Sequence, residues 1–135
     1  MSIDEVRDLS ALYLDAAGIA FDRHGEEFRF GRTREGFIWV SALTFQEDYA
    51  HLFGALPFIV PEDLTTDALS ALNALNRSLA EGCFFLIEDK ILLRQTVFLP
   101  DAFAVKSALT AALSRQALFM LWGRDAFARF HILVP

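Results

Sequence analysis

The chain has 135 residues, of which 54% are hydrophobic, 22% are charged and 14 are phenylalanine, and its formal net charge is −6. The length predicts one domain spanning residues 1–135, and the apolar composition excludes an intrinsically disordered chain. The acidic balance, with no cluster of lysine and arginine, argues against binding to nucleic acid and against adhesion to an anionic membrane.

A first helix is predicted over residues 3–17. Ser2 and Glu5 have the spacing of a capping box, in which each side chain satisfies a backbone N–H group at the start of a helix. Apolar residues then recur at helical spacing, and Gly18 suits the left-handed position that follows the last turn.

Period-two patterns after this helix predict three strands. Phe28 and Phe30 alternate with charged residues, as in a strand with one buried face. Residues 33–36 (TREG) form a predicted turn. Residues 37–45 (FIWVSALTF) are apolar on both faces and rich in β-branched and aromatic side chains, which indicates a central strand. A weaker third strand is predicted within residues 48–56.

The next part of the chain predicts a helix followed by a hairpin. Residues 61–81 carry leucine and alanine at intervals of three and four, and Gly82 is a suitable stop signal. Two apolar segments, residues 83–88 and 91–98, are separated by a short turn. Such a short connection permits only antiparallel pairing.

A last helix begins after Asp101, which is a suitable N-terminal cap, and we expect Gly123 to end or interrupt it. Residues 124–135 are an apolar tail to which we assign no structure. The predicted order is therefore α-β-β-β-α-β-β-α. Because strands come in runs rather than in βαβ units, this order predicts an α+β fold with an antiparallel sheet and helices packed on it.

No metal site is evident in the sequence. The three histidines are far apart, and the single cysteine has no CxxC partner. Asp22, His24 and Glu26 alternate and would share one face of a strand, but Gly25 favours a solvated turn at that point. We therefore expect no metal ligands here.

Signatures of catalysis are also missing from the sequence, which contains no phosphate-binding loop, dinucleotide fingerprint or nucleophile elbow. Ser41 lies in an apolar strand without a nearby histidine, and we interpret it as a core or interface hydroxyl. We interpret Cys83 as a small buried hydrophobic residue. These observations predict a protein without catalytic residues and without a cofactor.

Two asparagines, Asn73 and Asn76, lie beside the leucine stripe of the second helix. Asparagine is a poor residue inside a helix because its amide competes for backbone hydrogen bonds. At a partly buried flank, such an amide can instead satisfy the backbone of a strand edge or the polar atoms of a partner chain. Two exposed asparagines without a role are the alternative.

Residues 60–101 (VPEDLTTDALSALNALNRSLAEGCFFLIEDKILLRQTVFLPD) resemble the YbjN family of bacterial sensory-transduction regulators. The residues that carry the resemblance are the proline-led helix, the Asn73 and Asn76 pair, and the Gly82-x-Phe84 motif that opens the hairpin. With residues 13–22 (YLDAAGIAFD), the resemblance covers most of the chain.

The chain is also similar to the related class I type III secretion chaperones. The hairpin turn at residues 88–90 lacks the glycine usual in the YbjN family, and residues 117–122 (ALFMLW) make the last helix more apolar than is expected of that family. In these respects the chain looks closer to the chaperones, which are also small and acidic. Both resemblances imply a small α+β, chaperone-like fold that is commonly dimeric and binds proteins. Neither supplies a catalytic residue.

Cellular location and assembly follow from the remaining composition. The single cysteine excludes an internal disulfide, and the start of the chain lacks a secretory signal, so we expect a cytoplasmic protein. No apolar stretch approaches the roughly 18 residues of a membrane span. The high apolar fraction fits either a phenylalanine-rich core or an exposed contact surface, and we expect a homodimer.

The sequence thus predicts a non-enzymatic protein-binding module, chaperone-like or regulatory, that captures an extended client segment by strand addition or in apolar grooves. The alternative is a small-molecule sensor or an enzyme with a pocket between sheet and helices. The residues expected at protein-binding surfaces are Ile38, Val40, Leu118, Trp122 and Phe127. Those expected at a dimer contact are Leu69, Asn73 and Asn76.

Overall fold

The computed structural model describes residues 1–130 and 132–133 of the chain. Six strands form one antiparallel sheet in the order β1-β2-β3-β4-β7-β6. Their bounds are β1 (Asp22–His24), β2 (Glu27–Arg34), β3 (Phe37–Gln46), β4 (Tyr49–Ala55), β6 (Cys83–Ile87) and β7 (Lys90–Phe98). The short strands β5 (Phe58–Ile59) and β8 (Ile132–Leu133) pair with each other.

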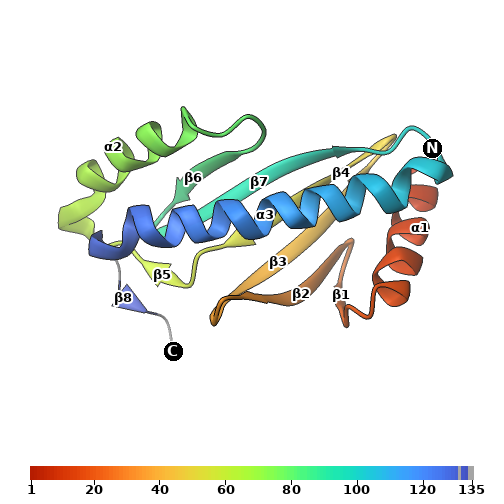
Figure 1. Cartoon of the computed structure of the whole chain (residues 1–135), viewed down its shortest axis with the longest axis horizontal. Helices are drawn as coiled ribbons and strands as arrows, with labels where there is room; N and C mark the ends of the chain where they lie inside the picture. Colours follow the sequence, from red (N-terminus) through yellow and green to blue (C-terminus); the bar gives the residue numbers. More distant parts are fainter. Residues whose placement is uncertain (131, 134–135) are drawn as a thin grey trace.

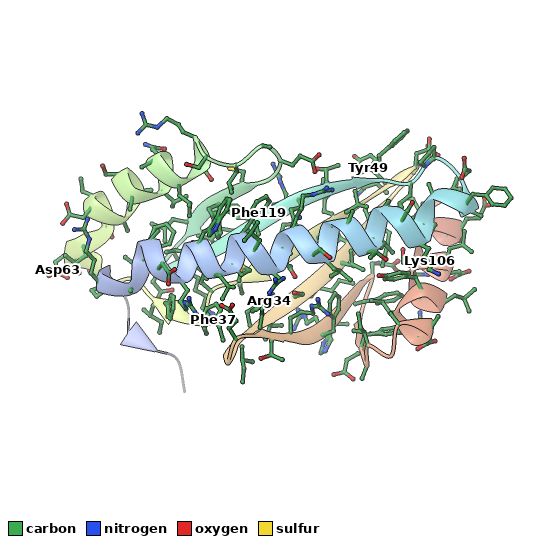
Figure 2. All side chains as sticks on the ribbon, in the orientation of Figure 1. Arg34, Phe37, Tyr49, Asp63, Lys106 and Phe119 are labelled. Carbon is green, nitrogen blue, oxygen red and sulfur yellow. The ribbon has the colours of Figure 1, made fainter. Side chains whose placement is uncertain are left out.

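Three α-helices pack on one face of this sheet: α1 (Ile3–Ala16), α2 (Thr65–Asn76) and α3 (Val105–Phe127). The long α3 runs across the whole sheet, with α1 at one of its ends and α2 at the other (Figure 1). Lys106 lies at the α1 end of the molecule and Asp63 at the α2 end (Figure 2). Single 3₁₀ turns precede α2 and α3 and follow α3, namely η1 (Glu62–Leu64), η2 (Ala102–Ala104) and η3 (Ala128–Phe130). The predicted α+β class is confirmed.

The local signals at the start of the chain are confirmed as well. Ser2 Oγ accepts a hydrogen bond from the backbone N–H of Glu5 at 3.1 Å, and a carboxylate oxygen of Glu5 accepts one from the N–H of Ser2 at 3.2 Å. This is the capping box that the spacing predicts. Gly18, with φ of +73°, follows the last turn of α1.

Both predicted hairpins are antiparallel. Between β2 and β3, Arg34 pairs with Phe37, and the two linking residues Glu35 and Gly36 have positive φ, as a type I′ turn requires. Between β6 and β7 the connection is likewise two residues long, one fewer than the turn predicted from the sequence. Strand β3 is an interior strand, as its composition indicates.

The predicted limits of two helices are wrong. The helix predicted over residues 61–81 is shorter, because α2 ends at Asn76 and only the 3₁₀ turn η1 precedes it. Gly123 does not end the last helix, and α3 passes through it to Phe127. A Cβ atom at position 123 would lie 3.0 Å from the ring of Phe84, so the glycine allows α3 to approach β6 closely. Strands β1, β5 and β8 were not predicted.

A polar cluster lies within the core between sheet and α3. Trp39 Nε1 donates to Ser41 Oγ at 3.1 Å and to Gln116 Oε1 at 3.2 Å. Ser41 Oγ donates to the same Gln116 oxygen at 3.0 Å, and Gln116 Nε2 donates to the carbonyl oxygen of Phe53 at 3.0 Å. Ser41 is therefore a core hydroxyl, as predicted, and its hydrogen bonds satisfy the buried glutamine.

Within the described residues, no helix combines the length and the hydrophobicity needed to cross a membrane.

Candidate functional site

One face of the sheet is not covered by any helix of the described residues. Along β3, Trp39 and Leu43 point under the helices and are each 1% exposed, whereas Ile38 and Val40 on the opposite face are 66% and 56% exposed. An antiparallel sheet that leaves one face to solvent usually carries polar side chains there. An apolar solvent-facing side therefore calls for a functional explanation.

Strand register brings apolar residues of four strands together on this face. Val40 pairs with Ala55, Ala55 with Leu92, and Leu92 with Phe85, so one row crosses β3, β4, β7 and β6. A parallel row contains Ala42 and Phe53. We call this surface the open-face patch, and its members are Ile38, Val40, Ala42, Phe53, Ala55, Phe85 and Leu92.

A shallow hollow of about 590 Å³ lies over the patch. Val40, Phe53 and Leu92 are among the residues that line it, together with the charged side chains of Glu27, Arg29 and Lys90. Because Glu27 pairs with Arg29, the hollow combines an apolar floor with the positive charge of Lys90, which suits an amphipathic ligand.

The positive charges near the patch are not all neutralised within the chain. Arg29 forms an ion pair with Glu27. Lys90 and Arg94, which flank Leu92 on β7, are exposed and form no ion pair with any residue that the structure describes. In a chain of net charge −6, two uncompensated cations beside an apolar patch favour an acidic partner.

His51 on β4 faces the same side of the sheet. Its Nδ1 atom lies 3.3 Å from Thr96 Oγ1. Burial, together with the charge of Arg94, lowers the pKa of His51. The imidazole therefore stays neutral to a lower pH than an exposed histidine would, and the cations of this face at neutral pH are the lysine and the arginines.

The five predicted binding residues do not form one surface. Ile38 and Val40 are exposed on the open face, whereas Leu118 and Trp122 are exposed on α3, on the other side of the sheet. The assignment of Phe127 to a surface is wrong. Because α3 continues through Gly123, Phe127 turns inward, is completely buried and packs edge-on against Phe84.

Two of the three residues predicted at a dimer contact, Leu69 and Asn73, are exposed on α2. The third, Asn76, forms hydrogen bonds within the chain. The N–H of Phe84 donates to Asn76 Oδ1 at 2.8 Å, and Asn76 Nδ2 donates to the carbonyl oxygen of Phe84 at 2.9 Å. Its amide is therefore not free for a partner, which corrects the prediction for this residue.

The contact of Asn76 also affects the predicted binding mode. Strand β6 lies at the edge of the sheet, and β7 is its one partner among the described strands. The amide of Asn76 occupies the backbone groups that Phe84 directs away from β7, and a side chain at this position closes the edge to an added strand. Strand addition at Phe84 is thus blocked. Cys83 beside it is exposed rather than buried, so that interpretation is also wrong.

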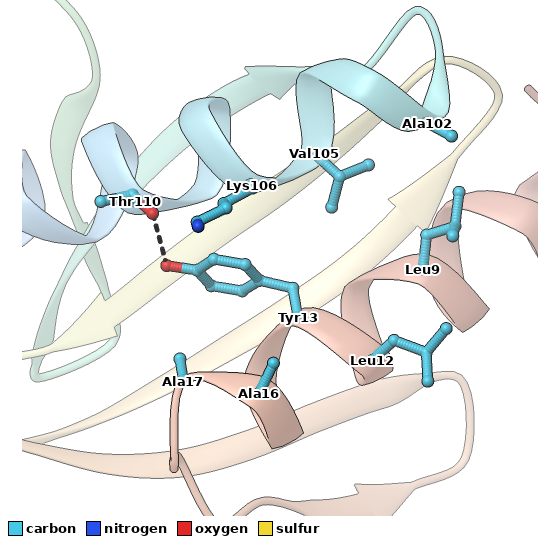
Figure 3. Close-up of a pocket in the computed structure, with 9 residues that line it drawn as sticks. All are labelled: Leu9, Leu12, Tyr13, Ala16, Ala17, Ala102, Val105, Lys106 and Thr110. Carbon is cyan, nitrogen blue, oxygen red and sulfur yellow. Dashed lines mark hydrogen bonds between the residues drawn. The ribbon is translucent and has the colours of Figure 1, made fainter.

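A second hollow lies between α1 and the start of α3 (Figure 3). Its volume is about 430 Å³, and the hydroxyl groups of Tyr13 and Thr110 meet across it at 2.8 Å. The side chain of Lys106 lies beside this hydroxyl pair (Figure 3). The nine residues that line the groove are Leu9, Leu12, Tyr13, Ala16, Ala17, Ala102, Val105, Lys106 and Thr110.

In the part of the chain that the structure describes, no three histidine, cysteine or carboxylate side chains are placed to hold a metal ion. Asp22 and His24 lie on β1, and Gly25 turns the chain with φ of +61° before Glu26, as the sequence indicates.

Sequence reasoning missed the contribution of β7 to the open face. Its residues alternate strictly, with Lys90, Leu92 and Arg94 outside and Ile91 and Leu93 buried. This alternation is visible in the sequence. The apolar hairpin pattern predicts the strand but does not show which of its side chains face solvent.

No family model matches the sequence, and no curated protein matches it. Among solved structures, the chain is similar to the crystal structure of YbjN from E. coli, a protein proposed to be a transcription regulator. The TM-score is 0.70, the match covers 95% of each chain, and 14% of the aligned residues are identical. At that identity the likeness concerns the fold. The chain therefore has a YbjN-like fold, as the resemblance of residues 60–101 implies.

Proposed function

We propose that this chain is a non-enzymatic protein-binding module, regulatory or chaperone-like, whose binding surface is the open-face patch. The observation that carries the proposal is the uncovered apolar face of the sheet, on which Ile38 and Val40 are more than half exposed. The YbjN-like fold is consistent with such a role, since YbjN itself is proposed to be a regulator.

The partner that this surface fits is an amphipathic segment with acidic side chains. Its apolar side chains would lie in the hollow over Val40, Phe53 and Leu92, and its carboxylates would meet Lys90 and Arg94. Full burial of an aliphatic side chain contributes about 1.5–3 kcal/mol. Covering the exposed parts of Ile38 and Val40 would then contribute roughly half of that for each residue.

A pair of designed peptides tests the proposal. One peptide alternates leucine and glutamate, and the other alternates leucine and lysine, so the two differ only in charge. We expect fluorescence anisotropy to show binding of the acidic peptide and little binding of the basic one. Binding should weaken as salt is added, because the charged contacts are at the surface.

Surface variants locate the binding. Replacing both Ile38 and Val40 with serine should abolish binding, and exchanging Lys90 and Arg94 for glutamate should transfer the preference to the basic peptide. The matched control removes two exposed apolar residues from α3 instead, through Leu118→Ser and Trp122→Ser, and should bind normally. Equal affinity of the open-face and α3 variants for the acidic peptide would contradict the proposal.

A further inference from the structure

The end of the molecule formed by α1 and η2 carries an exposed aromatic ring. Phe103 is 96% exposed, although phenylalanine normally contributes to cores or contacts. The turn that carries it is held firmly. Asp101 Oδ1 accepts a hydrogen bond from the N–H of Ala104 at 3.1 Å, and Ser107 Oγ donates to the carbonyl oxygen of Ala104 at 3.3 Å. The exposed ring thus lies on a turn that two hydrogen bonds stabilise.

The groove between α1 and α3 reaches the turn that carries this ring, because Ala102 is among the residues that line the groove (Figure 3). Ala102 and Val105, the close chain neighbours of Phe103, line the groove, whereas Phe103 itself does not. Phe103 lines an adjoining hollow of about 510 Å³, which shares Lys106 and Thr110 with the groove. The protein therefore presents an exposed aromatic ring next to an apolar groove. We call the Phe103 ring the knob and the α1–α3 groove the recess, and the knob does not fill the recess of its own chain.

The groove has the properties required to receive a phenyl ring. Leu9, Leu12 and Val105 provide apolar walls. Lys106 forms no ion pair with a residue in the described part of the chain, so its ammonium group is free to approach the face of an aromatic ring. The volume of about 430 Å³ is sufficient for one phenylalanine side chain.

We infer that this end of the molecule is a self-association surface, in which Phe103 of each of two copies enters the α1–α3 groove of the other. A twofold axis brings the same patch of both copies together, so a knob next to a recess meets its complement twice. This site is separate from the open-face patch and from the predicted contact at Leu69 and Asn73. The inference does not depend on the proposed function.

The expected size of the contact sets the expected affinity. A buried phenylalanine removes about 150–250 Å² from solvent. Two rings and the groove walls that they cover give roughly 600–1,000 Å² in total, counting a similar area for the walls as for the rings. Stable interfaces bury about 1,200–2,000 Å². We therefore expect a reversible dimer whose population rises with protein concentration.

The test is sedimentation velocity over a series of protein concentrations. The wild-type protein should shift from monomer to dimer, whereas Phe103→Ser, which removes the knob, and Ala16→Trp, which fills the recess, should stay monomeric. The control Phe98→Ser removes another phenylalanine, 66% exposed but on the open face, and should dimerise as the wild type does. Circular dichroism should show all three variants folded, because each changed position is exposed.

Mixing the two monomeric variants provides the most specific test. Phe103→Ser keeps its recess and Ala16→Trp keeps its knob, so their mixture should form a heterodimer through one of the two contacts, more weakly than the wild type. A wild-type protein that stays monomeric at several hundred micromolar, a Phe103→Ser variant that still dimerises, or a mixture that stays monomeric would each overturn the inference. Peptide binding at the open face should be unchanged in Phe103→Ser, which separates this test from that of the proposed function.

Discussion

The two faces of β3 carry similar side chains in different surroundings. Trp39 and Leu43 lie under α3 and belong to the core, whereas Ile38 and Val40, their neighbours in the chain, face solvent. Hydrophobicity alone therefore does not distinguish a core residue from an exposed residue in this strand. The distinction comes from the helices, which cover one face of the sheet and leave the other exposed.

The largest expected effect comes from removing the central side chain of the covered face. Trp39→Ala should lower the free energy of unfolding by about 3–5 kcal/mol, because it opens a cavity and also takes a donor from Ser41 and Gln116. Ile38→Ala on the open face should cost less than about 1 kcal/mol. Urea denaturation measures both. Similar losses for the two variants would mean that the faces do not differ as described.

Glycines on the two faces allow the same comparison at the backbone. Gly123→Ala places a Cβ atom 3.0 Å from the ring of Phe84 in the covered layer, and overpacking of this kind costs about 1–3 kcal/mol. Gly31 lies on the open side of β2, where an added Cβ meets no atom within 4 Å. We expect Gly31→Ala to be neutral or slightly stabilising in thermal unfolding. Alanine also favours a helix interior over glycine by about 1 kcal/mol, so a Gly123→Ala variant more stable than the wild type would show that the Phe84 ring moves aside without cost.

The two asparagines of α2 give a third, smaller contrast. Asn76→Ala leaves the N–H and carbonyl groups of Phe84 without their partner, and we expect a loss of about 1–2 kcal/mol. Asn73→Ala, three residues earlier on an exposed position, should be neutral or slightly stabilising because alanine favours the helix. Chemical denaturation measures the free energy of unfolding of both variants. Equal effects of the two substitutions would contradict the role of Asn76 at the strand edge.

Features that depend on neighbouring residues in the chain could be predicted from the sequence. The capping box at Ser2 and Glu5 and the antiparallel β6–β7 hairpin follow from spacing and connection length. The intramolecular role of Asn76 is one of three alternatives that the pattern allows. Predicting these features does not require knowing which distant residues pack against them.

Features that depend on distant packing could not be predicted in the same way. From the sequence alone, Gly123 resembles a helix stop signal, but it allows close packing against Phe84. Phe127 resembles a surface residue, but the helix continues and turns it inward against the same ring. The same limit applies to the proposed binding surface. The alternation along β7 is visible in the sequence, but only the position of α3 shows which set of side chains stays uncovered.

The smallest expected effect concerns His51 on the open face. Burial and Arg94 lower its pKa in the folded protein, so the unfolded chain takes up the proton first as the pH falls below about 6.5. The stability contributed by neutral His51 is present above that pH and is lost as the pH falls through the lower pKa of the folded state. Between about pH 7 and pH 5, the wild type should therefore lose slightly more stability than His51→Gln. Parallel pH profiles of the two proteins would contradict this.

The central claim is that partners bind the uncovered face of the sheet, and methyl NMR tests it most directly. Isoleucine, leucine and valine methyl groups report each face separately, so the peptide of alternating leucine and glutamate can be titrated into the labelled protein. We predict that the signals of Ile38, Val40 and Leu92 shift with increasing peptide, while those of Leu69 on α2 and Leu118 on α3 stay in place. Shifts at Leu69 or Leu118 without shifts at Ile38 and Val40 would contradict the account.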